Sequence, residues 1–175
     1  MKKITLVFLI IIAALFIYFR IDKSPDEDEI SAELREWIAM QEKFEYQGYN
    51  LSYHDTGDLQ KEVIILLHGY PTSSYDWQPI WEELSKEYRL IAMDMLGYGL
   101  SDKPDSIDYA IAFQTNIQEA LLSHLGIDKV HVLAHDVGDN IAQELLARWD
   151  EKSDNDQLVL KSVTLLNGGL FPETH

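Results

Sequence analysis

The residues with the clearest catalytic chemistry form the run Ala134-His135-Asp136-Val137-Gly138, between a predicted strand and a predicted helix. A nucleophile elbow at such a place lifts one side chain above the sheet, and small neighbours permit its strained backbone. The raised position holds Asp136. A carboxylate attacks an sp³ carbon without help from a base and leaves an alkyl ester that water must cleave. Asp136 is therefore the candidate nucleophile, although this short pattern is weak when taken alone.

A second loop, residues 68–71 with the sequence His-Gly-Tyr-Pro, follows a continuous apolar run. Cleavage of an ester develops an oxyanion, which backbone N–H groups stabilise. With a nucleophile elbow, one N–H comes from the residue after the nucleophile and the other from a loop of this kind. We expect these donors to be the N–H groups of Val137 and Tyr70. The supporting residues are expected to be His68, Gly69, Pro71 and His135. The alternative is that Gly-x-Pro only forms a turn.

A third loop, residues 94–101, contains Gly-x-Gly. It lacks the third glycine and the helix start of a dinucleotide fingerprint, so we interpret it as a structural loop. His131 and His135 lie four residues apart on a predicted strand, which separates them by about 13 Å and excludes a shared metal ion. No metal or other cofactor is predicted.

The elements that must position these loops alternate along the chain. A strand pair is predicted over residues 44–55, further strands over 63–67, 89–93, 130–134 and 158–166, and helices over 75–88, 109–125 and 138–149. Such alternation is typical of an α/β fold with a mainly parallel sheet and flanking helices. Ligands bind such sheets at the carboxyl ends of the strands, where these loops lie.

The N-terminus is apolar from residue 4 to residue 19, with Lys2 and Lys3 before the run and Arg20 and Lys23 after it. A helix over this run would be about 24 Å long, somewhat short of a ~30 Å hydrocarbon core, but flanking Lys and Arg can snorkel. Residues 1–21 are interpreted as a membrane anchor or, alternatively, as a signal peptide without a recognisable cleavage site. Both interpretations direct the chain to a membrane, and the equal flanking charges leave the side undecided.

Residues 22–41 are predicted to be an acidic linker that ends in a short amphipathic helix over residues 30–41. The remaining residues, 42–175, form the predicted folded domain. The whole chain has 175 residues, no cysteine and a formal charge of −16. The charge excludes nucleic acid as a partner, because phosphate would be repelled. The absence of cysteine excludes disulfides, thiolate metal sites and cysteine nucleophiles.

Taken in order, the three loops resemble the α/β-hydrolase family, in the branch with an aspartate nucleophile that contains epoxide hydrolases and haloalkane dehalogenases. The segments that carry the resemblance are residues 68–77, 99–104, 135–136, 143–146 and 167–175. The resemblance extends from about Leu34 to the end of the chain. It implies Asp136 as the nucleophile, an alkyl-ester intermediate and a small apolar electrophile such as an epoxide as the substrate.

Two departures narrow the expected chemistry. Dehalogenases of this branch usually have Asn at the position of Tyr70 and Trp at the position of Val137, and these two side chains bind the leaving halide. Dehalogenation is therefore disfavoured and stays an alternative. Epoxide hydrolases accept an aromatic residue in the first loop, which agrees with Tyr70, but they too usually have Trp after the nucleophile. Asp139 stands where many relatives have a small residue.

The resemblance also implies a helical cap, a catalytic acid and a catalytic histidine after the nucleophile. Residues 137–175 hold only one predicted helix, one strand and a loop, and His175 precedes the expected cap, so it is not assigned as the base. We therefore expect the chain to be the N-terminal part of a membrane-anchored hydrolase, inactive in turnover by itself. The competing hypothesis is a non-catalytic protein with this fold at a membrane.

Overall fold

The computed structural model describes residues 30–151 and 158–168. The chain divides into two compact units, Met1–Arg35 and Glu36–His175, and only residues 30–35 of the first unit are described. The predicted anchor (residues 1–21) and the acidic part of the linker lie outside the described residues. Within the described ranges, no helix combines the length and the apolar character that a membrane crossing needs.

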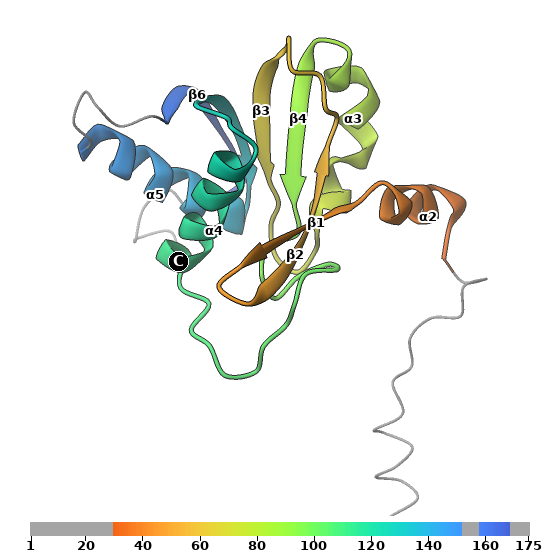
Figure 1. Cartoon of the computed structure of the whole chain (residues 1–175), viewed down its shortest axis with the longest axis horizontal. Helices are drawn as coiled ribbons and strands as arrows, with labels where there is room; N and C mark the ends of the chain where they lie inside the picture. Colours follow the sequence, from red (N-terminus) through yellow and green to blue (C-terminus); the bar gives the residue numbers. More distant parts are fainter. Residues whose placement is uncertain (1–29, 152–157, 169–175) are drawn as a thin grey trace, which may run out of the picture. The chain divides into compact units, whose positions relative to one another are not determined.

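A six-stranded sheet with the order β1-β2-β4-β3-β5-β6 forms the centre of the second unit (Figure 1). The strands are β1 (Glu42–Tyr46), β2 (Tyr49–Asp55), β3 (Glu62–Leu67), β4 (Tyr88–Met93), β5 (Lys129–His135) and β6 (Val159–Leu166). The helices are α2 (Ala32–Ala39), the 3-10 helix η2 (Ser74–Trp77), α3 (Gln78–Ser85), α4 (Ile111–His124) and α5 (Val137–Glu151). The pairs β3–β4, β3–β5 and β5–β6 are parallel, whereas β1–β2 and β2–β4 are antiparallel. The mainly parallel α/β sheet predicted from the sequence is confirmed.

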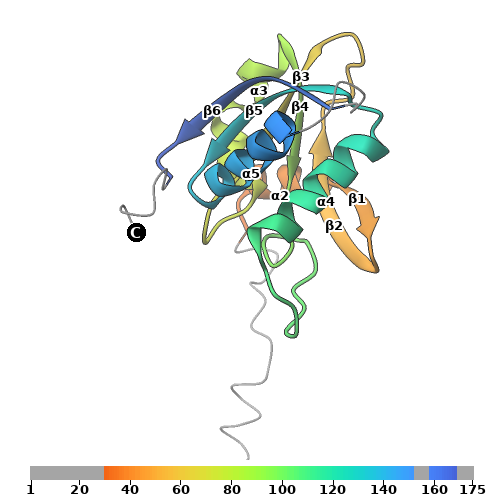
Figure 2. The same ribbon diagram turned by 90° about the vertical axis from the view of Figure 1, so that its left-hand side faces the viewer.

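Helices cover both faces of the sheet, with α3 on one face and α4 and α5 on the other (Figure 2). The side chains of β3 alternate between these two layers. Ile65 and Leu67 pack in the cluster that contains the buried residues of α4 and α5. Ile64 and Leu66 pack in the cluster that contains Trp77. This burial on both faces explains why β3 is apolar at successive positions.

The face covered by α3 also holds an aromatic cluster around His54 of β2. The His54 ring lies 4.0 Å from the Trp37 ring and 5.7 Å from the Trp81 ring, measured between centroids. The Trp37 Nε1–H donates to Ser74 Oγ at 3.3 Å. Burial lowers the pKa of His54 to about 4, with the charge of Asp94 opposing the shift. His54 is therefore a neutral packing residue at neutral pH.

One predicted helix differs from the observed structure. The helix predicted over residues 75–88 begins as η2, for which the Ser73 side chain accepts the N–H of Tyr75. It ends at Ser85, because Tyr88 is already the first residue of β4. The apolar residues at helical spacing identified the helix. Tyr88 has the same spacing, but it belongs to β4.

Candidate active site

The elbow between β5 and α5 has the predicted geometry. Asp136 is the single residue between the two elements and adopts a left-handed conformation, with φ = +54°. Such a backbone is unfavourable for a residue with a side chain and persists only when its surroundings fix it. A Cβ atom at Gly138 would lie 2.3 Å from the carbonyl oxygen of Leu67. Only glycine therefore lets the elbow approach the end of β3 so closely.

The carboxylate of Asp136 is held through one of its two oxygens. Oδ1 accepts the N–H groups of Tyr70 at 2.8 Å and of Val137 at 2.7 Å. Oδ2 has no hydrogen bond with any described residue. The N–H of Tyr70 and, to a lesser degree, that of Val137 lower the pKa of Asp136, and burial opposes them only in part. The carboxylate is therefore ionised at neutral pH, oriented by the main chain, and has one free oxygen.

His68 fixes the loop that supplies the Tyr70 donor. Its Nε2 accepts the N–H of Met95 at 3.0 Å, so the proton of a neutral ring is on Nδ1, which lies 2.9 Å from the carbonyl oxygen of Gly69. Burial lowers the pKa of His68 and keeps the ring neutral. Both ring nitrogens are used, which makes His68 a support for the loop and not a base.

Gly69 lies directly against the candidate nucleophile. A Cβ atom added there would lie 2.6 Å from the Asp136 Cβ and 2.9 Å from Oδ1. Pro71 follows Tyr70 in a cis peptide bond and is exposed. The close approach at Gly69 is what lets the Tyr70 N–H reach the carboxylate.

A buried carboxylate that the sequence analysis did not single out organises the third loop. Asp94 accepts the Ser74 N–H on Oδ1 at 2.8 Å and the Leu100 N–H on Oδ2 at 2.7 Å. A Cβ at Gly99 would overlap the same carboxylate, at 2.1 Å from Oδ2. These contacts are those expected of the structural loop predicted for residues 94–101. The available signal was an aspartate directly after a buried strand and followed by Gly-x-Gly.

A pocket of about 340 Å³ lies beside the elbow and is lined by Tyr70, Thr72, Asp76, Trp77, His135 and Leu166. His135 is half-buried in this wall. Among the hydrogen bonds of the described residues, none joins a histidine ring to Asp136. The structure thus brings together Asp136, Tyr70 and Val137 with the support of His68 and Gly69, and it places His135 beside them without a bond.

No group of three or more His, Cys, Asp or Glu side chains suited to a metal ion occurs in residues 30–151 and 158–168. The arrangement at the elbow offers instead an oriented carboxylate oxygen and two main-chain donors. Such a site can form an ester on an sp³ carbon and stabilise the oxyanion of its cleavage.

Comparisons with known proteins agree with this geometry. The chain is 45% identical over 152 residues to the mesoderm-specific transcript homolog protein of Bos taurus, covering 84% of this chain and 45% of that protein. It is 37% identical over 105 residues to epoxide hydrolase 1 of Caenorhabditis elegans, covering 59% of this chain and 26% of that protein. The haloalkane dehalogenase DatA from Agrobacterium tumefaciens C58 superposes with a TM-score of 0.62 and 28% identity, over 73% of this chain and 40% of that one.

The chain spans less than half the length of each of these relatives. The match that decides the family is to the sequence model of the alpha/beta hydrolase fold, and it covers residues 62–174. This range includes the loop at residues 68–71, strands β3 to β6 and the elbow. The chain belongs to the alpha/beta hydrolase fold family.

Proposed function

We propose that this chain carries the nucleophile half of an α/β-hydrolase that opens epoxides or related small apolar electrophiles through an ester on Asp136, without a cofactor. One observation carries the proposal: two backbone N–H groups hold Oδ1 of Asp136, and Oδ2 is unbonded. A carboxylate in this state is ionised, oriented and unbonded on the oxygen that must attack.

The proposed reaction has two steps. Oδ2 attacks one epoxide carbon, the bond from that carbon to the epoxide oxygen breaks, and the resulting alkoxide takes a proton from water to give a hydroxyalkyl ester. Water then attacks Cγ of Asp136, and the negative charge develops on Oδ1. The N–H groups of Tyr70 and Val137 already point at this oxygen, so they stabilise the tetrahedral intermediate without reorganisation. The hydroxide left by protonation of the alkoxide takes one proton of the attacking water. The Cγ–Oδ2 bond then breaks and the proton of the new carboxyl passes to the departing oxygen, so the diol leaves with Oδ2 and the water oxygen completes the restored carboxylate.

The leaving group favours epoxides over alkyl halides. A departing halide needs donors of its own, because it leaves as a free anion. The side chain of Val137 has no donor, and the Tyr70 side chain is 68% exposed. The oxygen of an epoxide stays attached to the substrate and accepts a proton instead. The similarity to a protein named epoxide hydrolase 1 supports the same choice.

Trapping of the ester tests this function. The chain is incubated with styrene oxide, and the adduct is located by intact mass and peptide mapping. We expect a single adduct on Asp136, no adduct in Asp136→Asn, and normal adduct formation in Asp128→Asn, a carboxylate at the opposite end of β5. Labelling of Asp136→Asn at the wild-type rate would disprove the nucleophile. No adduct in any form, including a longer form of the protein, would favour the alternative of a non-catalytic protein with this fold.

We also propose that residues 1–21 attach the protein to a membrane, because the apolar run at residues 4–19 is flanked by lysine and arginine. Flotation with lipid vesicles tests this. The full chain is expected to float and a chain that begins at residue 22 to remain at the bottom. Flotation of both forms would assign the attachment to another part of the molecule.

A further inference from the structure

Asp139, on the first turn of α5, has no role in the reaction proposed above. Its side chain is fully buried. Oδ1 accepts the N–H of Leu166 at 3.3 Å, and Oδ2 has no hydrogen bond with a described residue. A Cβ at Gly168 would lie 2.2 Å from Oδ2, so the chain that leaves β6 passes directly over this carboxyl. A buried polar group of this kind is costly unless it holds something in place.

What it holds is the end of β6, and this end also contacts the nucleophile. The backbone of Leu166 is bonded on both sides: its N–H donates to Asp139, and its carbonyl oxygen accepts the N–H of Asp136 at 3.1 Å. The Leu166 side chain lines the pocket beside the elbow. One residue therefore connects the buried carboxyl with the main chain of the candidate nucleophile.

Two residues next to Leu166 have strained backbones: Asp136, which is hydrogen-bonded to it, and Asn167, which follows it in the chain. Asp136 and Asn167 both adopt left-handed conformations, with φ of +54° and +58°. Residues with side chains keep such conformations only where neighbouring groups fix them. The Asp136 N–H is fixed by Leu166, and Leu166 in turn is fixed by Asp139. Removal of the carboxyl would leave the Leu166 N–H without its acceptor and would loosen both strained residues.

We propose that Asp139 is a positioning residue, whose carboxyl fixes the end of β6 and thereby holds the main chain of Asp136 in the orientation for attack. The inference rests on the proposed role of Asp136 as the nucleophile. Asp139 does not touch the substrate in this account. It acts through Leu166.

The chemistry of the carboxyl suggests a conservative replacement. Burial is the main cause that raises the pKa of Asp139, and the nearby charge of Asp136 adds to it, while the N–H of Leu166 opposes both. An asparagine amide has nearly the same shape as a carboxyl and keeps one oxygen that can accept the Leu166 N–H. Asp139→Asn therefore keeps the contact that Asp139→Ala removes.

Two measurements on the full chain test the proposal, both under conditions where circular dichroism shows each variant to be folded. The first is the rate at which styrene oxide labels Asp136. The second is the hydrogen exchange rate of the Asp136 amide, compared with the Asp94 amide, which is bonded to the Ser52 carbonyl at 2.8 Å. In Asp139→Ala we expect labelling to slow by about 10- to 100-fold, since small displacements of a nucleophile have effects of this size. Exchange at Asp136 should become at least about 10-fold faster, because local opening is easier.

The matched variants separate positioning from simple loss of stability. Asp139→Asn is expected to stay within about 3-fold of wild type in both measurements, as should Asp128→Ala, an exposed carboxylate before β5. In Gly168→Ala the added methyl group must displace the same carboxyl. This variant should therefore resemble Asp139→Ala in both measurements. If Asp139→Ala does not fold, Gly168→Ala and Asp139→Asn still provide the comparison.

Three outcomes would overturn the inference. If Asp139→Ala folds and shows wild-type rates of labelling and amide exchange, Asp139 only fills space in the core and does not position Asp136. Asp139→Asn as slow as Asp139→Ala would show that the acceptor for Leu166 is not what matters. A wild-type exchange rate of the Asp136 amide in Gly168→Ala would show that the end of β6 does not fix the main chain of the nucleophile. If wild type itself is not labelled, the proposed function fails, and amide exchange alone then decides whether Asp139 fixes the elbow.

Discussion

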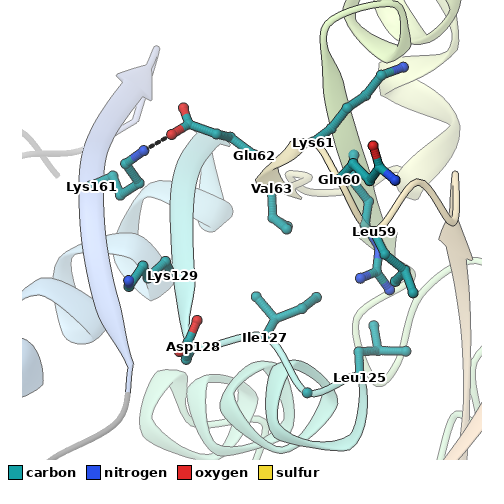
Figure 3. Close-up of a pocket in the computed structure, with 12 residues that line it drawn as sticks. Leu59, Gln60, Lys61, Glu62, Val63, Leu125, Ile127, Asp128, Lys129 and Lys161 are labelled. Atoms are coloured by element: carbon teal, nitrogen blue, oxygen red, sulfur yellow. Dashed lines mark hydrogen bonds and ion pairs between the residues drawn. The ribbon is translucent and has the colours of Figure 1, made fainter.

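The sheet has one edge at the amino ends of its parallel strands (the amino edge) and one at their carboxyl ends (the carboxyl edge). These two edges differ in a way that the volumes of their pockets do not reveal. At the amino ends of β3, β5 and β6, a pocket of about 510 Å³ exceeds the one of about 340 Å³ beside Asp136. Figure 3 shows Val63 and Ile127 pointing toward one another inside it, with Lys161 bonded to Glu62 at its rim. By volume alone, this would be the first place to look for a site.

The charges at the two edges are used differently. At the amino ends, Arg89 pairs with Asp55, and Lys61 pairs with Asp58. These charges neutralise one another. At the carboxyl ends, two neutral N–H groups hold the charge of Asp136, the proposed nucleophile, and no ion pair among the described residues neutralises it. The comparison separates two uses of charge: paired charges at the amino ends, and at the carboxyl ends a carboxylate that the main chain orients without neutralising it.

The largest expected effect belongs to the amino edge and concerns stability. Arg89 and Asp55 form a bidentate pair in which each side chain is only 8% exposed. Asp55→Ala leaves the guanidinium buried without its partner, which should lower the free energy of unfolding by about 3–5 kcal/mol. Urea denaturation measures the loss. Asp58→Ala, at the more exposed pair with Lys61, is the control and should cost less than about 1 kcal/mol.

The same Asp55→Ala variant should label Asp136 with styrene oxide at the wild-type rate, once the rate is divided by the folded fraction. A slower labelling rate in fully folded protein would mean that the two edges are coupled. The Arg89–Asp55 pair would then influence the reactivity of Asp136.

The next effect is a loss of stability in acid. His54 has an unfolded pKa near 6.5 and a folded pKa of about 4, so the unfolded chain binds its proton first as the pH falls. The contribution of His54 is complete above pH 6.5 and is lost progressively toward pH 4, about 3 kcal/mol in total. The lowered pKa of His68 adds a loss in the same direction. His54→Phe, which preserves the packing with Trp37 and Trp81, should flatten the stability profile measured by urea denaturation between pH 7 and 4.5.

Lowering the pH should reduce the stability of the protein without reducing the reactivity of Asp136. The pKa of Asp136 lies below the ordinary 3.8 because of the Tyr70 N–H, so Asp136 stays ionised while His54 is still titrating. Between pH 6.5 and 5, labelling per folded molecule should therefore stay constant as the stability falls. A rate that decreases together with the stability would show that protonation in this range reaches the elbow.

Two glycines give a matched test of the two edges. Gly69→Ala places a methyl group against the Asp136 side chain and should slow labelling by about 100-fold, because the carboxylate must move. Gly126, near the larger pocket, has φ = +67° and open space around its missing Cβ. Gly126→Ala should cost about 1 kcal/mol of stability and leave labelling unchanged. The reverse result would place the reactive group at the amino edge.

The smallest effect concerns the ion pair drawn in Figure 3. The Glu62 side chain is 58% exposed and Lys161 is 35% exposed. Lys161→Ala should change the free energy of unfolding by less than about 1 kcal/mol, and the change should shrink further at high salt. Thermal unfolding at two salt concentrations measures it. A loss of several kcal/mol would show that this pair contributes more than an exposed ion pair does.

Much of the fold and the centre of the site could be predicted from the sequence because the signals are local. The apolar runs of β3 and β4 showed strands buried on both faces, and the order of the loops placed Tyr70 and Val137 beside Asp136. The partners of Asp139 and Asp94 could not be predicted. Asp139 bonds to a backbone group 27 residues away, and Asp94 accepts backbone N–H groups, which every residue except proline has. The position of Asp94 after a buried strand could have marked it as a structural residue, but the main-chain partners of the two carboxyls leave no pattern in a single sequence.

The same dependence on the main chain has a consequence for how such a site can change over time. Both donors to Oδ1 of Asp136 belong to the peptide backbone, so replacing the side chain at position 70 or 137 leaves the two N–H groups in place. Those side chains can then vary while the two hydrogen bonds that orient the carboxylate are kept. Positions 70 and 137 can therefore change their side chains at low risk to the hydrogen bonds that orient Asp136.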